Sequence, residues 1–252
     1  MEAKIIAIVN HKGGVGKTTT AVNLTASLAT FEKKVLLVDL DPQANATSHF
    51  DVNAEEGNNI YLSIRGDLKE LPIVKLNDCL DLVPSSLDLS AAEIEITSKI
   101  SRETILHKLI KPLRSKYDYI IIDCPPSLGL LTINALATSQ KTIIPVDFGT
   151  FAVIGMAKLI DIIQAVKENI NDDLSENCIL LTKYDPRMNM HKDMLSSIRE
   201  TLEERTFDTI IRTNIALNEA AYNNKPIVEY SPQSNGAIDY LKLAEEIINT
   251  KF

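Results

Sequence analysis

The residues best suited to chemistry lie in a glycine-rich loop near the start of the chain. Residues 10–19 read Asn-His-Lys-Gly-Gly-Val-Gly-Lys-Thr-Thr and follow the apolar run of residues 5–9. Glycines permit backbone conformations closed to other residues. A loop of this kind, placed between a strand and a helix, turns backbone N–H groups toward phosphates. The sequence therefore predicts a triphosphate-binding loop, formed by Gly13, Gly14, Val15 and Gly16.

Side chains around these glycines have predicted roles in the same loop. We expect Lys17 to reach the β- and γ-phosphates and the Thr18 hydroxyl to ligate Mg²⁺, with Thr19 also at the nucleotide. The usual pattern is G-x-x-x-x-G-K-[ST], and this chain departs from it. His11 stands at the first glycine position, and a second lysine, Lys12, precedes the glycines. A solvated loop cation is the plain alternative for Lys12.

Two carboxylates follow the second apolar run, where the phosphates should lie. Asp39 and Asp41 are two residues apart at the end of a predicted strand. Phosphoryl transfer depends mostly on positioning and charge neutralisation, so one carboxylate can suffice to orient the attacking water. We expect Asp41 to orient that water and Asp39 to support the metal or its water shell. The alternative is a cluster of Asx turns and helix caps.

A third carboxylate ends another apolar run. Residues 119–123 read Tyr-Ile-Ile-Ile-Asp, which is typical of a buried strand that delivers one carboxylate near Mg²⁺, usually through water. We therefore expect Asp123 to serve the metal, and we expect Cys124 to be a packing residue. The predicted ligands are a nucleoside triphosphate and Mg²⁺.

The rest of the chain alternates apolar runs with amphipathic stretches. Continuous Ile, Val and Leu runs favour parallel strands buried on both faces. Strands are expected at residues 4–9, 34–39, 80–84, 119–123, 141–145 and 178–182. Helices are expected at residues 17–29, 87–99, 102–115, 128–138, 151–169, 190–204, 216–222 and 234–251. This order predicts an α/β fold with a doubly wound, mostly parallel sheet, helices on both faces and ligands at the carboxyl ends of the strands. We expect one domain over residues 1–252, with residues 51–72 irregular.

Composition narrows the class of protein. The net charge of −8 is unlike that of a strongly basic nucleic-acid binder, so any DNA contact needs a local patch. No apolar run approaches the length of a membrane span, and a strand is expected almost at the first residue, so we expect no signal peptide. Three isolated cysteines show no metal-ligand spacing and indicate reduced thiols. We expect a cytoplasmic protein without a membrane partner.

The loop and its companions resemble a known family. The run K-G-G-V-G-K-T-T at residues 12–19 resembles the deviant Walker A loop of the ParA/MinD ATPases, which are P-loop NTPases. The run D-L-D-P-Q-A-N-A-T at residues 39–47 and the segment at residues 123–136 resemble the switch and Walker B regions of ParA proteins. The resemblance implies that Lys12 reaches across a homodimer to the partner's ATP. It also places the aspartate critical for hydrolysis at Asp41.

Later segments resemble the same family less closely. Residues 209–220 resemble the family segment I-P-R-N-V-R-L-S-E-A, which places Asn214 on an adenine contact. Arg187 matches a basic position that contacts DNA in relatives. The family proline is replaced by Arg212, which could stack on the base or contact DNA, and a family DNA-contacting arginine is replaced by Ala216.

The resemblance implies a ParA-like partition ATPase with slow intrinsic turnover. ATP would close a sandwich homodimer, the dimer would bind DNA without sequence preference, and a ParB-like partner would stimulate hydrolysis. The protein would then be nucleoid-associated when ATP is bound. Cations that could form the DNA patch are Lys183, Arg187, Lys192, Arg199, Arg205 and Arg212.

Other functions stay open at this point. A ParA-type ATPase that positions a non-DNA cargo would have the same biochemistry. A MinD-like membrane-associated ATPase would need a Lys/Arg-rich amphipathic terminal helix, whereas residues 237–252 carry three acidic residues and an apolar face suited to core packing. A relative of the nitrogenase iron protein would need cysteines that this chain lacks at suitable spacing.

Overall fold

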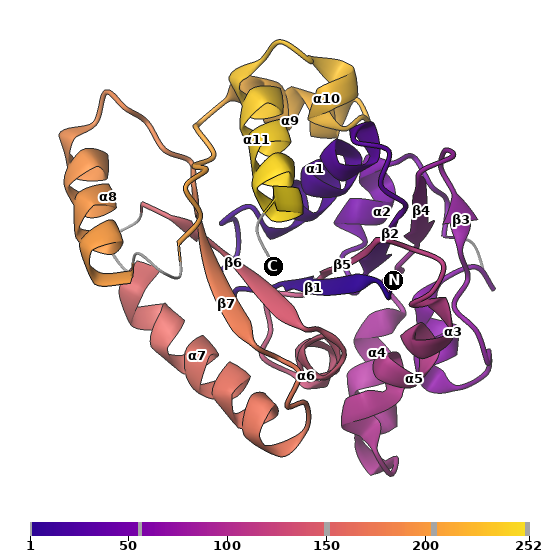
Figure 1. Ribbon diagram of the computed structural model, residues 1–252. Coiled ribbons are helices and arrows are strands. Elements are labelled where there is room, and N and C mark those ends of the chain that lie inside the picture. The colour runs from indigo at the N-terminus through magenta and orange to yellow at the C-terminus, as the bar shows by residue number, and fades with distance from the viewer. Residues whose placement is uncertain (1, 55–56, 149–151, 203–205, 250–252) are drawn as a thin grey trace.

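A seven-stranded sheet forms the centre of the molecule (Figure 1). The computed structural model describes residues 2–54, 57–148, 152–202 and 206–249. The strands are β1 (Lys4–Ile8), β2 (Val35–Asp39), β3 (Val74–Lys75), β4 (Leu80–Val83), β5 (Tyr119–Asp123), β6 (Lys141–Asp147) and β7 (Glu176–Thr182). Their order is β3-β4-β2-β5-β1-β6-β7, and only the β3–β4 pair among these neighbours is antiparallel.

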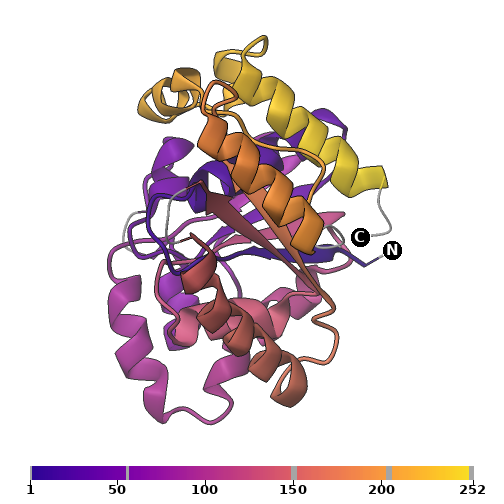
Figure 2. The same cartoon turned by 90° about the vertical axis from the view of Figure 1, so that its left-hand side faces the viewer.

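Helices cover both faces of this sheet, as the view from the β7 side also shows (Figure 2). The helices are α1 (Lys17–Thr30), α2 (Asn45–His49), α3 (Ile60–Arg65), α4 (Leu89–Glu95), α5 (Ile105–Ile110), α6 (Leu130–Thr138), α7 (Ala152–Asn169), α8 (Asn189–Leu202), α9 (Ile215–Tyr222), α10 (Ile227–Tyr230) and α11 (Asn235–Asn249). Helices α3 to α7 contribute to one core, and α1, α9, α10 and α11 contribute to the other.

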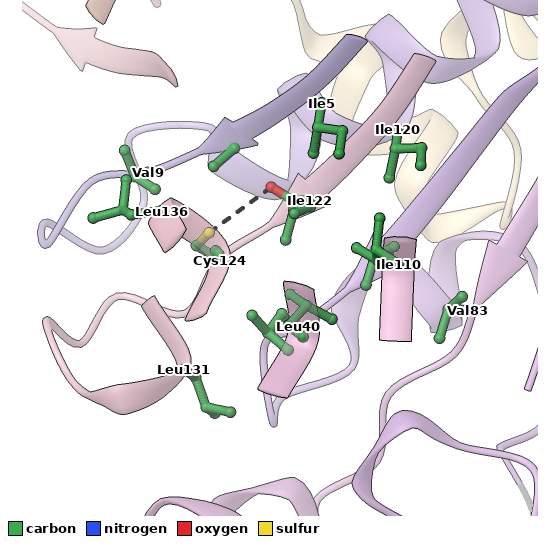
Figure 3. Close-up of a cluster of buried hydrophobic side chains, with 14 of the residues drawn as sticks. Ile5, Val9, Leu40, Val83, Ile110, Ile120, Ile122, Cys124, Leu131 and Leu136 are labelled. Atoms are coloured by element: carbon green, nitrogen blue, oxygen red, sulfur yellow. Dashed lines mark hydrogen bonds between the residues drawn. The ribbon is translucent and has the colours of Figure 1, made fainter. Parts of the chain in front are cut away.

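Successive side chains of a strand point to opposite faces, and this alternation divides the two cores. Ile120 and Ile122 of β5 pack in the core beneath α4 to α6, whereas Tyr119 and Ile121 pack in the core beneath α1. Figure 3 shows part of the first core, in which the Cys124 thiol lies 3.9 Å from the carbonyl oxygen of Ile122. Cys124 is fully buried there, and its role as a packing residue fits this position.

The predicted fold class is confirmed, while several element boundaries differ. The helix expected at residues 102–115 is α-helical only over Ile105–Ile110, with short 3₁₀ turns at Arg102–Thr104 and Lys111–Leu113. Pro112 lies in the second of these turns. Proline lacks an N–H and clashes with the preceding helical turn, which explains why the α-helix stops at Ile110.

The region expected to be irregular, residues 51–72, contains helix α3 instead. The Asn59 side chain caps this helix by accepting a hydrogen bond from the Tyr61 backbone N–H at 3.2 Å. Gly66 ends it in the left-handed conformation, with a φ of 94°. Asn59 and Gly66 are ordinary residues for the start and the end of a helix. The helix between them was not predicted because the residues around it are mostly polar.

The ends of three predicted helices, at residues 151, 203–204 and 250–251, lie outside the described residues. Within the described part of the chain, no helix has the length and apolar character needed to cross a membrane. The last described helix, α11, instead buries its apolar face against α1 and α10, through Tyr240, Leu243, Ala244 and Ile247.

Candidate nucleotide-binding site

The glycine-rich loop joins the end of β1 to the start of α1, as the sequence predicts. Gly14 and Gly16 have φ values of 75° and 94°, a region that suits glycine. Gly16 stands immediately before the first residue of α1, so the helix N-terminus and its free N–H groups face the loop. The hydroxyl of Thr182, at the end of β7, donates to the carbonyl of Val15 at 2.9 Å and so anchors the loop to that strand.

Lys17 lies at the base of this loop and is 7 % exposed. Its Nζ donates to the carbonyl oxygen of Lys12 at 3.2 Å. Burial lowers the pKa of Lys17, while the nearby Asp123 and Asp41 carboxylates act in the opposite direction. An ammonium group held in this way satisfies a backbone carbonyl until a stronger acceptor, such as a phosphate oxygen, is present.

Lys12 has a different partner. Its Nζ lies 2.8 Å and 3.0 Å from the two carboxylate oxygens of Asp147, the last residue of β6. Asn10 fixes the backbone nearby, because its amide donates to the carbonyl of Pro145 at 2.7 Å and its oxygen accepts from the Lys12 N–H at 3.0 Å. The sequence assigned no role to Asn10 or Asp147, because the contacts Asn10–Pro145 and Lys12–Asp147 each join residues 135 positions apart in the chain.

Strand register brings two of the predicted acidic residues side by side. Asp39 of β2 and Asp123 of β5 are direct partners at the carboxyl ends of neighbouring parallel strands. Both share the strand face of Leu37 and Ile121, which pack beneath α1. The two side chains therefore lie on the face where the loop and the start of α1 are found.

The environment of Asp39 and Asp41 is a network of local hydrogen bonds. The Asp39 carboxylate accepts from the Thr47 N–H at 2.8 Å, from the Thr47 hydroxyl at 2.7 Å and from the Asp41 N–H at 3.2 Å. The Asp41 carboxylate accepts from the Gln43 N–H at 3.0 Å. The Asx-turn alternative thus describes part of what these residues do. It does not exclude a role at the nucleotide, because each carboxylate has further acceptor capacity.

Asp123 contrasts with Asp39, because among the described residues no group makes a well-formed hydrogen bond to either of its fully buried carboxylate oxygens, although the Thr18 side chain lies close enough to act on the carboxyl group. Burial raises the pKa of Asp123 well above its usual range, and the Asp39 charge raises it further, while Thr18 and Lys17 lower it. Burial likewise raises the pKa of Asp39 to about 6. Two adjacent buried carboxylates with one ammonium group nearby, that of Lys17, are a costly arrangement, and a divalent metal would relieve it.

Mg²⁺ fits this set of donors. Among the residues that the structure describes, no group of three His, Cys, Asp or Glu side chains could hold a metal alone. Mg²⁺ usually keeps several waters and takes one or two carboxylates together with substrate phosphates. Thr18, Asp39 and Asp123 can supply the protein part of such a shell, with the nucleotide supplying the rest.

A cavity of about 270 Å³ opens beside the loop and reaches the start of α9. Its walls include Val15, Gly16, Thr19, Thr182, Arg212 and Asn214. Asn214 caps α9, because its side-chain oxygen accepts from the Ala216 N–H at 2.9 Å. Its amide N–H₂ remains for another acceptor. A larger cavity, of about 370 Å³, lies at the opposite ends of β1 and β6, too far from the glycine loop to take part in phosphate chemistry.

The two arginines expected to meet DNA or the base are both paired with carboxylates. The Arg212 guanidinium donates to Asp239, with Nη2 2.6 Å from Oδ1, and the Asp239 side chain is 5 % exposed. Arg187 is 88 % exposed and forms two side-chain hydrogen bonds to Asp185, at 3.0 Å and 2.7 Å. The Arg187 guanidinium also lowers the pKa of Asp185 to about 2.

Among the other cations named for the DNA patch, Lys183, Lys192 and Arg199 are exposed. Arg199 donates to the carbonyl of Asp208 at 3.1 Å. Arg205 lies outside the described residues.

Taken together, the fold and this site define a P-loop nucleotide-binding protein with an extra lysine in the loop. Residues 3–176 match the model of a family described as an AAA domain. The chain is 44% identical over 247 residues to the sporulation initiation inhibitor protein Soj of Bacillus subtilis. The aligned residues cover 97% of this chain and 98% of that protein. It is 42% identical to the chromosome partitioning protein ParA of Myxococcus xanthus, over 97% of this chain and 88% of that protein.

Solved structures with bound adenine nucleotides share this fold. Cobyrinic acid a,c-diamide synthase from Mycobacterium smegmatis, with bound ADP and magnesium, is 30% identical with a TM-score of 0.84, over 98% of this chain and 94% of that one. A putative plasmid partition protein from Borrelia burgdorferi bound to AMPPNP is 29% identical with a TM-score of 0.81, over 98% and 99% of the two chains. The chain therefore belongs to the ParA and Soj family of partition ATPases. It is an ATP hydrolase whose site takes ATP with Mg²⁺.

Proposed function

We propose that this chain acts as one ATPase domain, over residues 1–252, in plasmid or chromosome partition. ATP closes a sandwich homodimer, the dimer binds DNA without sequence preference, and a ParB-like protein stimulates hydrolysis and release. The protein works in the cytoplasm and associates with the nucleoid while ATP is bound. The observation that carries this proposal is the loop with two lysines, Lys12 and Lys17, set beside the paired carboxylates Asp39 and Asp123.

The residues divide the work of hydrolysis between them. Loop N–H groups and the Lys17 ammonium hold the β- and γ-phosphates. Thr18, Asp39 and Asp123 hold Mg²⁺, which neutralises charge on the phosphates when it is bound. Asp41, which is 6 % exposed, orients the attacking water. Lys12 supplies a further cation to the partner's nucleotide, so the dimer senses the γ-phosphate.

The base occupies the cavity between the loop and α9. Asn214 is positioned by its capping bond to the Ala216 N–H, so that its amide N–H₂ can donate to a purine nitrogen. Arg212 lines the same cavity. Its ion pair with Asp239 favours a structural role over stacking on the base or contact with DNA.

DNA binding rests on a local patch, since the whole chain is acidic. The exposed cations Lys183, Arg187 and Lys192 lie on or beside the segment between β7 and α8. Because Asp185 pairs with Arg187, the patch is weaker than its count of basic residues indicates. A non-DNA cargo is the second candidate, and this weak patch is the observation that favours it. A membrane role is disfavoured because α11 buries its apolar face.

The test is retention on non-specific DNA. Purified protein with Mg²⁺ and ATP should bind long duplex DNA of unrelated sequence, and it should release the DNA when ADP replaces ATP. Increasing salt should weaken the binding steeply. If the protein with ATP has no affinity for DNA even at low salt, the partition proposal fails and the non-DNA cargo takes its place.

A further inference from the structure

Ser85 is a buried residue that contacts the segment carrying the proposed water-orienting group. It lies two residues beyond the end of β4, and β4 pairs in parallel with β2 so that Val83 is opposite Val38. This register brings Ser85 beside the residues that follow β2, although Asp41 precedes it by 44 positions in the chain. The Ser85 side chain is fully buried there.

Two hydrogen bonds join Ser85 to the segment after β2. The Ser85 hydroxyl donates to the backbone carbonyl of Asp41 at 2.8 Å. The Ser85 backbone N–H donates to the Thr47 hydroxyl at 2.9 Å. That hydroxyl in turn donates to the Asp39 carboxylate at 2.7 Å. Both Ser85 bonds are buried, so water does not compete for them. One residue at the end of β4 is therefore bonded to two points of the segment that holds the acidic residues.

Ser85 is itself held in place by a second element. The residue before it, Pro84, has a φ angle that its ring fixes. The Pro84 carbonyl accepts from the Ile60 N–H, at the start of α3, at 2.8 Å. The Ser85 hydroxyl therefore connects the Asp41 backbone to a strand end and a helix start that lie outside the segment containing Asp41.

The other bonds of Asp41 towards the C-terminal side are local. Its carboxylate accepts from the Gln43 N–H at 3.0 Å, and its carbonyl accepts from the Ala44 N–H at 2.9 Å. Bonds of this kind fix the side chain relative to its own turn, but they do not fix the turn relative to a bound phosphate. The bond from Ser85 adds that external restraint. Small displacements of a group that orients a reactant cost much of the rate.

We propose that Ser85 is a positioning residue for hydrolysis, whose hydroxyl fixes the Asp41 backbone so that the Asp41 carboxylate meets the attacking water. This inference rests on the proposed role of Asp41 as the residue that orients that water. Ser85 acts through Asp41 and takes no part in the chemistry itself. Its loss should therefore lower kcat and leave the affinity for nucleotide unchanged.

Ser85→Ala is a clean variant because it removes a single bond. The backbone N–H of residue 85 remains for Thr47, so the network around Asp39 is kept. The Asp41 carbonyl keeps its bond from the Ala44 N–H, so it is not left unsatisfied. Loss of one neutral hydrogen bond should lower kcat about 3- to 10-fold.

The experiment compares wild type, Ser85→Ala, Asp41→Ala and the double variant, each as the full chain with Mg²⁺. Phosphate release at saturating ATP gives kcat, and calorimetry with a non-hydrolysable ATP analogue gives the affinity. In the Asp41→Ala background, Ser85→Ala should change the residual rate by less than about twofold, because residues that act as a unit have non-additive effects. A residue that only supports the fold would lower the rate in both backgrounds.

Ser86→Ala is the matched control. Ser86 is the adjacent serine, and within the described part of the chain its buried hydroxyl oxygen has no hydrogen-bond partner. The control variant should keep the wild-type kcat and the wild-type affinity for the analogue.

Other results overturn the proposal. An unchanged kcat in Ser85→Ala, while Asp41→Ala loses hydrolysis, would show that the Ser85 bond does not position Asp41. An equal fall in both backgrounds, or a loss of analogue affinity in Ser85→Ala, would show that Ser85 acts on something other than Asp41. If Asp41→Ala itself hydrolyses ATP at the wild-type rate, the proposed role of Asp41 fails, and the role of Ser85 fails with it.

Discussion

At the scale of single residues, the charged side chains of the site contact protein groups in positions where ligand atoms would bind. Lys17 donates to a backbone carbonyl, Lys12 donates to Asp147, and within the described part of the chain the Asp123 carboxylate accepts no well-formed hydrogen bond. Lys17 and Lys12 can each bind a phosphate oxygen, and the Asp123 carboxylate can bind a metal ion. Nucleotide and Mg²⁺ should therefore stabilise the protein strongly on binding.

Lys17 and Asp41 should separate binding from chemistry. Lys17→Ala removes the cation between the loop and the carboxylates, so ATP affinity should fall about 10- to 100-fold, as expected for loss of a hydrogen bond to a charged group. Asp41→Ala should keep ATP affinity and lose hydrolysis by about 100-fold or more, because only water positioning is lost. Calorimetry with an ATP analogue and phosphate release measure the two effects. Equal losses of affinity in both variants would refute this division of roles.

Asp123→Asn should stabilise the nucleotide-free protein. Burial raises the pKa of Asp123, so folding above the unfolded pKa of about 4 costs free energy that a neutral asparagine avoids. The gain should therefore be small below a pH of about 4 and grow as the pH rises above it, with a melting temperature higher by about 2–4 °C for each kcal/mol. With Mg²⁺ and ATP the order should reverse, because the variant lacks the metal ligand that we propose for Asp123. A variant that is less stable without nucleotide at pH 8 would contradict this account of the carboxylate pair.

At the scale of elements, the carboxyl ends of parallel strands assemble the site. β1 leads into the glycine loop, β2 and β5 deliver the aspartate pair, and β6 and β7 hold the loop through Asp147 and Thr182. The segment after β7 is fixed in turn by α11, because Asp239 accepts from both the backbone N–H and the guanidinium of Arg212.

Arg212→Ala should therefore act on stability more than on ligand binding. It leaves the nearly buried Asp239 carboxylate without its cation, which should cost about 2–3 kcal/mol after allowance for the partial exposure of Arg212. Chemical denaturation measures this loss, and Arg212→Lys should recover part of it. Unchanged stability together with a clear loss of DNA affinity would show that Arg212 is a DNA contact after all.

The apolar runs in the sequence predicted the central strands of the sheet well, because buried parallel strands are continuous apolar runs. The residues that follow these runs also predicted the site. The β2 and β5 runs end in aspartate, and the glycine loop follows β1 directly. The ion pairs were not predictable in the same way. Asp147 and Asp239 are ordinary acidic residues in the sequence, and their partners are brought to them only by the packing of distant elements. Sequence reasoning therefore treated Lys12 and Arg212 as available cations.

At the scale of the whole molecule, the net charge is negative, so DNA binding requires basic side chains that cluster on one part of the surface. Arg187 carries a neutralising partner, Asp185. Arg187→Ala should weaken binding to all DNA sequences alike and reduce the salt slope by about one. Asp185→Asn should strengthen binding, because it leaves the arginine charge uncompensated. Filter binding over a salt series measures both. If neither variant changes the affinity, the contact surface lies away from this segment.

We expect ATP to join two copies of this chain through the loop that carries Lys12. The most direct test is the molar mass of the Asp41→Ala protein, measured by light scattering after size-exclusion chromatography. This variant is used because it should bind ATP and retain it. With Mg²⁺ and ATP it should elute at twice the subunit mass of 27.9 kDa, and with ADP it should elute as a single subunit. A single subunit under saturating ATP would contradict the account.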